Sequence, residues 1–378
     1  MSRWLRQADD WFRIVLAIVV FRMRIFLSFF IVVLITFAAA AQGFDDPGAP
    51  AGKLPDVRSK KQWRHLRADV LDRMQQAMGP LPARDDFSIS IVDFVDSVQF
   101  ATYTRYHIRF PAAPNEPVYA YLYKPNAAGR KKVAAMLVLH GTGALGKDLV
   151  DGKSPRPNRA LAKELAERGY AVIAPDYPGM GELKHHDFSA DRYLSGTMKG
   201  IFNHMRCVDL LEHLPYVDSR RIGVIGHSLG GHNAMFAAAF DPRLKVIVAS
   251  CGWTLMDYYD IGPEGTNRYG GRLGPWAQEV YMPLLRDRYA LDPDRIPFDF
   301  DEVIAALAPR PFFSNSPLED ANFNVEGVRK GIASARRIYR LYRAADKLQV
   351  EYPEAGHDFP PDTRFKAYQF LDKHLQHR

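Results

Sequence analysis

Residues 222–231 read Ile-Gly-Val-Ile-Gly-His-Ser-Leu-Gly-Gly, and this stretch decides the fold. Its apolar start predicts a buried strand, and residues 233–240 predict a helix just beyond it. The turn between them has the form Gly-x-Ser-x-Gly with Ser228 at its centre, and its glycines leave room for a sharp, strained bend. Such a bend raises the serine hydroxyl above the sheet at a helix start, where backbone N–H groups favour developing negative charge. The pattern predicts a nucleophilic serine; the alternative is a serine that only caps the helix.

Short apolar runs alternate with helical segments on both sides of this turn. The runs that predict strands are 133–139, 171–174, 222–225, 246–249, 312–313 and 348–352. Apolar strands that alternate with helices predict an α/β fold whose mostly parallel central sheet is covered by helices on both faces. Ahead of them, a helix is predicted over 62–78, followed by antiparallel strands over 87–95, 103–110 and 118–123.

A downstream histidine is expected, because a serine hydroxyl is a weak nucleophile until a base takes its proton. His357 directly follows the predicted strand 348–352 and lies in a loop, which is where the base belongs. His374 and His377 fall in the last predicted helix and are expected at the surface. His232, close to the nucleophile turn, is expected to pack or hydrogen-bond within its helix. The sequence therefore assigns the base to His357.

The acid of such a triad should lie between the serine and the histidine, just after a strand. Residues 312–313 supply the strand, and Leu318-Glu319-Asp320 follows it. Asp320 is the predicted acid, because its shorter side chain suits a loop that orients an imidazole. Glu319 stays open as the alternative, since either carboxylate can fill the role.

Two backbone N–H groups are needed to stabilise the oxyanion of an acyl-transfer reaction. One comes from the residue after the nucleophile, which is Leu229. The second is expected in the compact loop His140-Gly141-Thr142-Gly143, and Thr142 is the predicted donor. The alternative for this loop is an ordinary glycine-rich turn.

The interval between Gly252 and Ala305 breaks the alternation, because it is longer than an ordinary connection. We interpret residues 253–304 as an insertion that shapes or caps the substrate site. Its candidate substrate-binding residues are Trp253, Tyr258 and Trp276, whose rings suit stacking on sugars better than binding a long acyl chain. The alternative is that the aromatic residues form a small core of the insertion itself.

Five short motifs carry a family resemblance. They are 139–143, 174–179, 226–231, 308–311 and 356–357. Together they resemble the α/β-hydrolases of the dienelactone hydrolase and acetyl xylan esterase group, from about residue 62 to the end. The resemblance implies an α/β-hydrolase fold, in which residues 253–304 would be an insertion before the acid-bearing strand. Dienelactone hydrolases proper use cysteine where this chain has Ser228, and glucuronoyl esterases carry arginine where it has Leu229. These motifs are specific for the fold and weakly specific for the substrate.

The first forty residues have a different composition from the rest. Residues 25–41 are apolar except for one serine and one threonine, follow Arg22 and Arg24, and close on four alanines. This pattern predicts an export signal over 1–41, and translation starting at Met23 would give it a tidier beginning. A retained membrane anchor is the alternative, because a run of 17 residues reaches the lower limit for spanning a bilayer. A linker over 42–61 and a hydrolase domain over 62–378 are expected to follow.

Charge and cysteine content exclude other function classes. The net charge is +7, and it would be +4 without residues 1–41, which carry five arginines and two aspartates. The remaining basic stretches are typical of solvated helix faces, so no nucleic-acid partner is predicted. Cys207 and Cys251 lie in buried patterns that favour free thiols over a disulfide. The adjacent His185, His186 and Asp187 predict a polar loop, because three consecutive residues cannot all converge on one metal ion.

These observations predict an exported serine carboxylesterase without a cofactor or a metal. It is expected to remove acetyl or other small acyl groups from carbohydrate-linked esters through Ser228, His357 and Asp320. The alternatives are a glucuronoyl-type or lipase-like esterase and a non-catalytic binding protein of the same fold. The membrane is a partner only if the N-terminal segment is retained, and the sequence predicts no oligomeric state.

Overall fold

The computed structural model describes residues 52–83, 92–128 and 131–377. These residues fall within one compact unit, Pro50–Arg378. The predicted export segment 1–41, with its alternative start at Met23, lies outside the described residues, as does the first part of the predicted linker 42–61. Among the helices of the described ranges, none is both long and apolar enough to cross a membrane.

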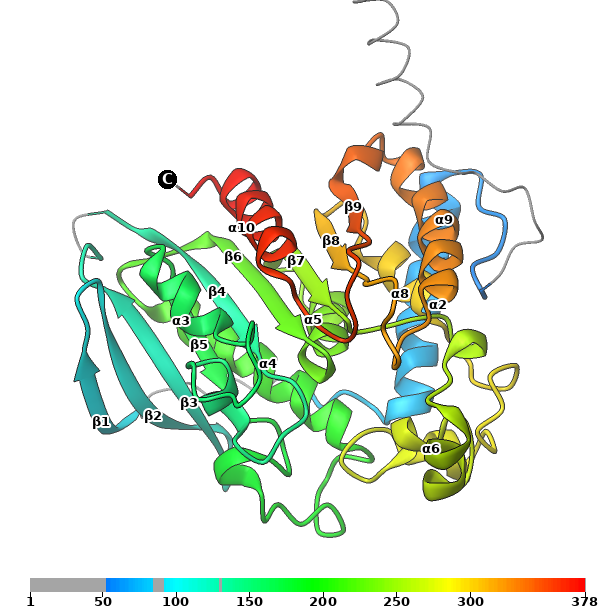
Figure 1. The fold of residues 1–378 in the computed structure, drawn as a ribbon, viewed down its shortest axis with the longest axis horizontal. Helices are drawn as coiled ribbons and strands as arrows, with labels where there is room; N and C mark the ends of the chain where they lie inside the picture. The colour runs from blue at the N-terminus through cyan, green and yellow to red at the C-terminus, as the bar shows by residue number, and fades with distance from the viewer. Residues whose placement is uncertain (1–51, 84–91, 129–130, 378) are drawn as a thin grey trace, which may run out of the picture. The chain divides into compact units, whose positions relative to one another are not determined.

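A single twisted sheet of nine strands organises the unit (Figure 1). The strands are β1 (Asp93–Gln99), β2 (Tyr103–Ala113), β3 (Glu116–Pro125), β4 (Val133–Leu139), β5 (Ala171–Pro175), β6 (Val217–His227), β7 (Leu244–Ser250), β8 (Phe312–Asn315) and β9 (Leu348–Glu351). Their order across the sheet is β1-β2-β3-β5-β4-β6-β7-β8-β9. The pairs from β1 to β5 are antiparallel, and those from β5 to β9 are parallel. The predicted mostly parallel sheet is confirmed.

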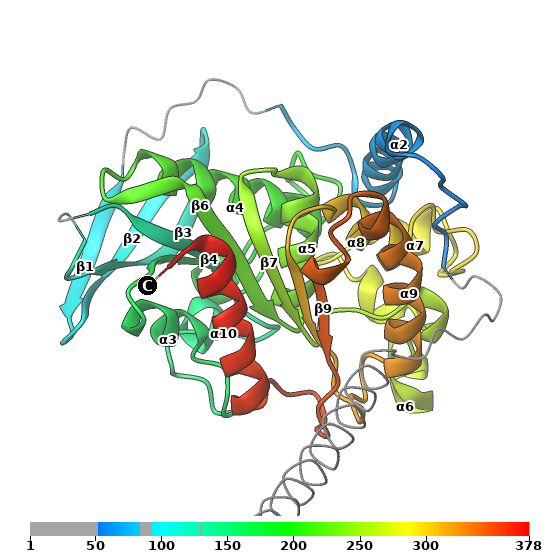
Figure 2. The same cartoon turned by 90° about the horizontal axis from the view of Figure 1, so that it is seen from above.

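Helices cover both faces of this sheet, as predicted (Figure 2). One side carries α3 (Leu161–Glu167) and α10 (Pro361–Leu375), and the other carries α4 (Gly196–His213) and α5 (Leu229–Phe240). Strand β4 shows why two layers are needed, because its side chains alternate between two apolar clusters. Met136 and Val138 pack with α3 and α10, whereas Leu137 and Leu139 pack with α4 and α5. A strand that is apolar on both faces is stable only when both are covered.

Helix α2 (Lys60–Met78) packs against α8 (Phe300–Leu307) near the far end of the sheet. Its N-terminus is capped by Ser59, whose hydroxyl accepts a hydrogen bond from the Gln62 amide at 3.2 Å. Leu54, in the segment predicted to be a linker, is buried, and its amide donates to the Asp301 carboxylate at 3.1 Å. The chain is therefore already packed on the domain before α2 begins.

The predicted insertion forms four short helical segments between β7 and α8. They are η3 (Met256–Tyr258), α6 (Gly262–Tyr269), η4 (Gly274–Ala277) and α7 (Leu284–Asp287). After β8 the chain continues through α9 (Val325–Leu341) to β9. Because β4, β6, β8 and β9 run parallel, their carboxyl ends meet at one edge of the sheet, next to this insertion. That edge is where open α/β sheets bind their ligands.

An ion pair between α2 and α8 gives a test of how α2 contributes to stability. The Arg73 guanidinium contacts both carboxylate oxygens of Glu302, at 2.7 and 2.9 Å, and the Glu302 side chain is 1% exposed. We expect Arg73→Ala to lower the free energy of unfolding by about 3–5 kcal/mol, because it leaves a buried carboxylate unpaired. Arg64→Ala, on the exposed side of the same helix, should change it by less than about 0.5 kcal/mol. Urea unfolding measures both, and equal effects would contradict the role given to this pair.

Candidate active site

Ser228 is the single residue between the end of β6 and the start of α5. Its backbone φ is positive, with φ 58° and ψ −121°, a strained conformation for a residue with a side chain. Hydrogen bonds hold this conformation: the Ser228 amide donates to the Ser250 carbonyl at 2.8 Å, and the Gly231 amide donates to the Ser228 carbonyl at 2.8 Å. The side chain is half-buried and borders a cavity. The sharp bend predicted from the sequence is present.

Two positions of the turn must be glycine, because neighbouring backbone segments lie too close to leave room for a side chain. A Cβ atom on Gly226 would lie 2.1 Å from the Gly230 carbonyl oxygen, and one on Gly230 would lie 2.0 Å from the Leu139 carbonyl oxygen. Neither contact can be relieved by turning a side chain. Strand β6, helix α5 and the end of β4 therefore meet at Ser228 only because both positions are glycine.

His357 lies in the loop after β9, and Asp320 lies in the loop after β8. The Nδ1 atom of His357 is 3.0 Å from each carboxylate oxygen of Asp320. The Asp320 side chain is 1% exposed, and its Oδ1 atom also accepts the amides of Asn322 and Phe323 at 2.8 and 3.2 Å. Glu319, the alternative acid, is exposed, so the structure places Asp320 rather than Glu319 against the histidine.

His357, the predicted base, lies next to the turn that carries Ser228. The rings of His357 and His227, the residue before Ser228, are 4.9 Å apart. His227 is buried and hydrogen-bonds through Nδ1 to the Ser250 hydroxyl at 2.9 Å. Burial and the nearby Arg159 charge hold the pKa of His227 well below its usual value, so this ring is neutral. His227 is therefore a poor proton acceptor, and His357 remains the predicted base for Ser228.

The predicted oxyanion loop lies directly beside Ser228. A Cβ atom on Gly141 would lie 3.5 Å from the Ser228 Cβ, because β4 and β6 are paired and both end here. The Thr142 hydroxyl hydrogen-bonds to the Tyr281 hydroxyl at 2.7 Å, which ties this loop to the insertion. Both Thr142 and Leu229 border the same cavity as Ser228. The two residues predicted as amide donors thus lie beside Ser228 at the same cavity.

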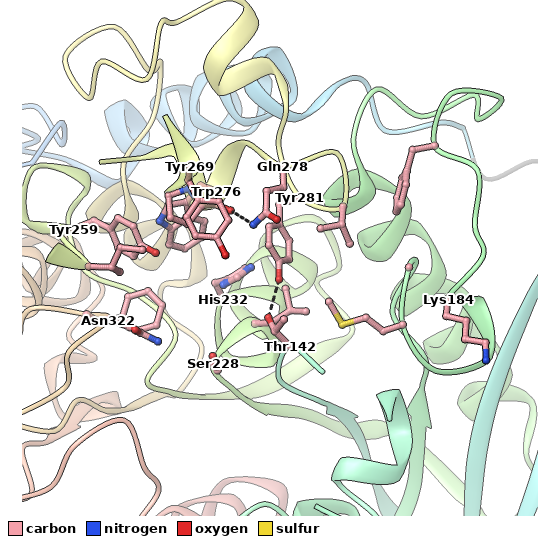
Figure 3. Close-up of a pocket in the computed structure, with 18 residues that line it drawn as sticks. Thr142, Lys184, Ser228, His232, Tyr259, Tyr269, Trp276, Gln278, Tyr281 and Asn322 are labelled. Carbon is pink, nitrogen blue, oxygen red and sulfur yellow. Dashed lines mark hydrogen bonds between the residues drawn. The ribbon is translucent and has the colours of Figure 1, made fainter. Parts of the chain in front are cut away.

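The cavity has a volume of about 530 Å³ and extends from Ser228 along the insertion (Figure 3). The insertion contributes aromatic side chains to its wall, among them Tyr259, Tyr269, Trp276 and Tyr281. Lys184 lies at one end and Asn322 at the other. Among the described residues that line the cavity, Lys184 is the one lysine, arginine, aspartate or glutamate. The wall is therefore mixed aromatic and polar, with few charges.

Two of the three predicted substrate-binding residues are not in this wall. Trp253 is 1% exposed and packs in the core, where its indole N–H donates to the Ser314 hydroxyl at 3.0 Å. Tyr258 packs against Gly327 of α9 beneath Lys330. Both predictions were wrong, because the chain after β7 turns these rings towards α8 and α9. Trp276 does line the cavity.

His232 also lines the cavity, one helical turn after Ser228. Its ring is 4.9 Å from the Trp276 ring, and burial lowers its pKa to about 3. The sequence predicted that His232 packs or hydrogen-bonds within its helix. No local motif indicates that its side chain also faces the cavity. The side chain is neutral, so it adds no charge to the cavity.

One group of three possible metal ligands lies within the described ranges. Ligand atoms of Cys251, Asp320 and His357 all lie within 4.8 Å of one another. Asp320 and His357 are already paired with each other, and the Cys251 thiol donates to the Asp358 carbonyl at 3.1 Å. Burial raises the pKa of Cys251 well above its usual value, which disfavours the thiolate that a metal would need. Cys207 and Cys251 are both buried and free.

Known proteins resemble this chain over most of its length. Residues 136–368 match the model of the alpha/beta hydrolase family. The chain is 27% identical to the putative hydrolase YtaP of Bacillus subtilis (strain 168) over 321 residues, which cover 82% of this chain and 100% of that protein. It is 22% identical over 367 residues to carbohydrate esterase MZ0003 of an unknown prokaryotic organism, covering 82% and 83% of the two chains. Among solved structures, a glucuronoyl esterase from Solibacter usitatus superimposes with a TM-score of 0.65 at 19% identity, covering 87% of this chain and 100% of that chain.

Exchange of the two neighbouring carboxylates tests which of them serves His357. We expect Asp320→Asn to lower kcat on an ester by about 10³-fold or more, because an amide cannot fix the imidazole tautomer as a carboxylate does. Glu319→Gln should leave kcat within about twofold, since that side chain is exposed. Steady-state kinetics on p-nitrophenyl acetate measures both variants. A large loss for Glu319→Gln with none for Asp320→Asn would reverse the assignment.

Proposed function

The chain belongs to the α/β-hydrolase family, and we propose that it is a serine carboxylesterase that removes acetyl or other small acyl groups from carbohydrate-linked esters. One observation carries the proposal: a strained serine borders a cavity, beside a histidine that is paired with a buried aspartate. Strain at one residue and a buried carboxylate both destabilise a fold, and they occur together where acyl transfer needs them.

The proposed reaction uses Ser228, His357 and Asp320 in two halves. His357 takes the proton of the Ser228 hydroxyl, and the serine oxygen attacks the ester carbonyl carbon. The negative charge that forms on the carbonyl oxygen is stabilised by the backbone N–H groups of Leu229 and Thr142. The C–O bond to the alcohol breaks, and the alcohol leaves with the proton held by His357. An acyl group then remains bonded to Ser228.

Water completes the cycle by the same steps. His357 takes a proton from water, whose oxygen attacks the acyl carbon, and the bond to Ser228 breaks. The carboxylic acid leaves and the serine regains its proton. Throughout, Asp320 holds the imidazole through Nδ1 and stabilises its positive charge. The amides of Asn322 and Phe323 donate to the Asp320 carboxylate and help to hold it in place.

The cavity wall favours a sugar-bearing ester over a long acyl chain. Aromatic rings of the insertion alternate with polar groups, as in sites that stack on a sugar ring and bond its hydroxyls. The relative that carries the name carbohydrate esterase supports the same substrate class. Leu229 favours acetyl over glucuronoyl esters, because glucuronoyl esterases carry an arginine at that position. The predicted export segment would place this activity outside the cytoplasm.

Replacing the nucleophile tests the proposed activity. We expect Ser228→Ala to lower hydrolysis of p-nitrophenyl acetate and of acetylated xylan by at least about 10⁴-fold, because it removes the atom that forms the acyl-enzyme. Ser189→Ala changes an exposed serine and serves as the matched control. Release of p-nitrophenol and of acetate provides the two measurements. Full activity in Ser228→Ala would contradict the mechanism, and activity only on long-chain esters would contradict the substrate class.

A further inference from the structure

The loop that carries His357 has little regular structure to hold it. It connects β9 with α10, and the His357 side chain must point towards Ser228. The Nδ1 bond to Asp320 fixes one edge of the ring but not the position of the backbone that carries it. Within the described ranges, the one group that hydrogen-bonds the His357 backbone is the Arg159 guanidinium, whose Nη2 donates to the His357 carbonyl at 3.0 Å.

The same guanidinium also forms an ion pair with the next residue of the loop, Asp358. Arg159 Nη1 is 2.5 Å from the Asp358 carboxylate, and the Arg159 side chain is 12% exposed. The other carboxylate oxygen of Asp358 accepts the Asn158 side-chain amide at 2.7 Å. Pairing with Arg159 and Asn158 lowers the pKa of Asp358, although burial opposes this change. One planar cation therefore holds two consecutive residues of the base-bearing loop.

The backbone of Asp358 is fixed from the opposite side. Its carbonyl accepts the Asn315 side-chain amide at 2.9 Å and the Cys251 thiol at 3.1 Å. These two residues lie at the ends of β8 and β7, so they anchor the loop to the sheet. The carboxylate and the carbonyl of Asp358 are thus both hydrogen-bonded, and Arg159 is the positively charged partner of the carboxylate.

Arg159 is itself held in place by its surroundings. It lies two residues before α3, next to Asn158, whose backbone is left-handed with φ 61°. Arg364 of α10 donates to the Asn158 side-chain oxygen at 2.9 Å and to the Phe359 carbonyl at 2.8 Å. The segment before α3 and the segment before α10 are therefore locked together around the base.

We propose that Arg159 is a positioning residue for the catalytic base. By holding the His357 carbonyl and the Asp358 carboxylate together, it sets the direction in which the imidazole faces Ser228. This inference rests on the proposed function for its effect on rate, whereas the arrangement of the His357 ring can be measured without any reaction. A small misplacement of a catalytic group lowers the rate strongly while leaving substrate binding intact.

The kinetic test compares two arginines of one loop. Arg159→Ala should lower kcat by about 10- to 100-fold with little change in KM, because the base is misdirected while the cavity is unchanged. Arg156→Ala removes an exposed arginine three residues away and should leave both constants unchanged. Added guanidinium at non-denaturing concentration should restore part of the kcat of Arg159→Ala. Arg159→Lys should recover less than wild-type activity, because an ammonium cannot present the same planar fork.

A second comparison separates positioning from general support of the fold. If Arg159 acts through His357, its loss should lower kcat only slightly once Asp320→Asn has already misdirected the imidazole. The fold-loss in kcat from Arg159→Ala should therefore be much smaller in the Asp320→Asn background than in the wild type. Multiplicative losses in the double variant would overturn the proposal. So would unchanged kcat in folded Arg159→Ala, or a loss equal to that of Arg156→Ala.

A spectroscopic readout keeps the inference testable if the ester activity fails. The Hδ1 proton of His357, shared with Asp320, should give a low-field proton resonance that disappears in Asp320→Asn. In Arg159→Ala this resonance should shift or broaden, whereas in Arg156→Ala it should stay unchanged. An unshifted resonance in Arg159→Ala would contradict the positioning role whether or not the protein hydrolyses esters. Absence of ester hydrolysis together with a shifted resonance would contradict only the proposed function.

Discussion

Close backbone contact around Ser228 is the constraint on which the rest of the site depends. The serine adopts a strained conformation with positive φ because β6 passes into α5 through one residue. The carbonyl oxygens of Leu139 and Gly230 occupy the space where side chains at positions 230 and 226 would otherwise stand. This arrangement requires glycine at 226 and 230 and a parallel neighbour in β4. The same pairing of β4 with β6 places residues 140–143 beside the serine. One steric constraint thus positions both the proposed nucleophile and the loop proposed to stabilise the oxyanion.

The remaining parts follow from the direction of the strands. Strands β8 and β9 run parallel to β6, so the loops after them reach the same edge of the sheet and bring Asp320 to His357. Behind them, buried polar groups rather than apolar packing determine the geometry. The side chains of His227, Ser250 and Asn315 hydrogen-bond in sequence, and Asn315 also bonds the Asp358 carbonyl. These buried hydrogen bonds restrict the loop after β9 to one arrangement.

Parts of the fold and site that depend on local pattern could be predicted from the sequence. Continuous apolar strands predicted the parallel sheet, and the position of His357 directly after a strand placed it near Ser228. Asp320 was predicted over the adjacent Glu319 from its shorter side chain, but only the structure shows in which direction each of the two side chains points. Trp253 and Tyr258 were predicted to bind substrate but lie outside the cavity wall, since the aromatic content of a segment does not tell whether a ring faces a cavity or the core. The contact between Arg159 and His357 joins residues 198 positions apart, and no local signal marks it.

Covalent labelling of the serine tests the central claim most directly. A fluorophosphonate reacts only with a serine hydroxyl that a neighbouring base has activated, so it reports nucleophile and base together. The account predicts one adduct per chain, located by mass spectrometry of peptides at Ser228, formed fast in the wild type and slowly in Asp320→Asn. Labelling at another serine, or equal labelling rates in the two proteins, would contradict it.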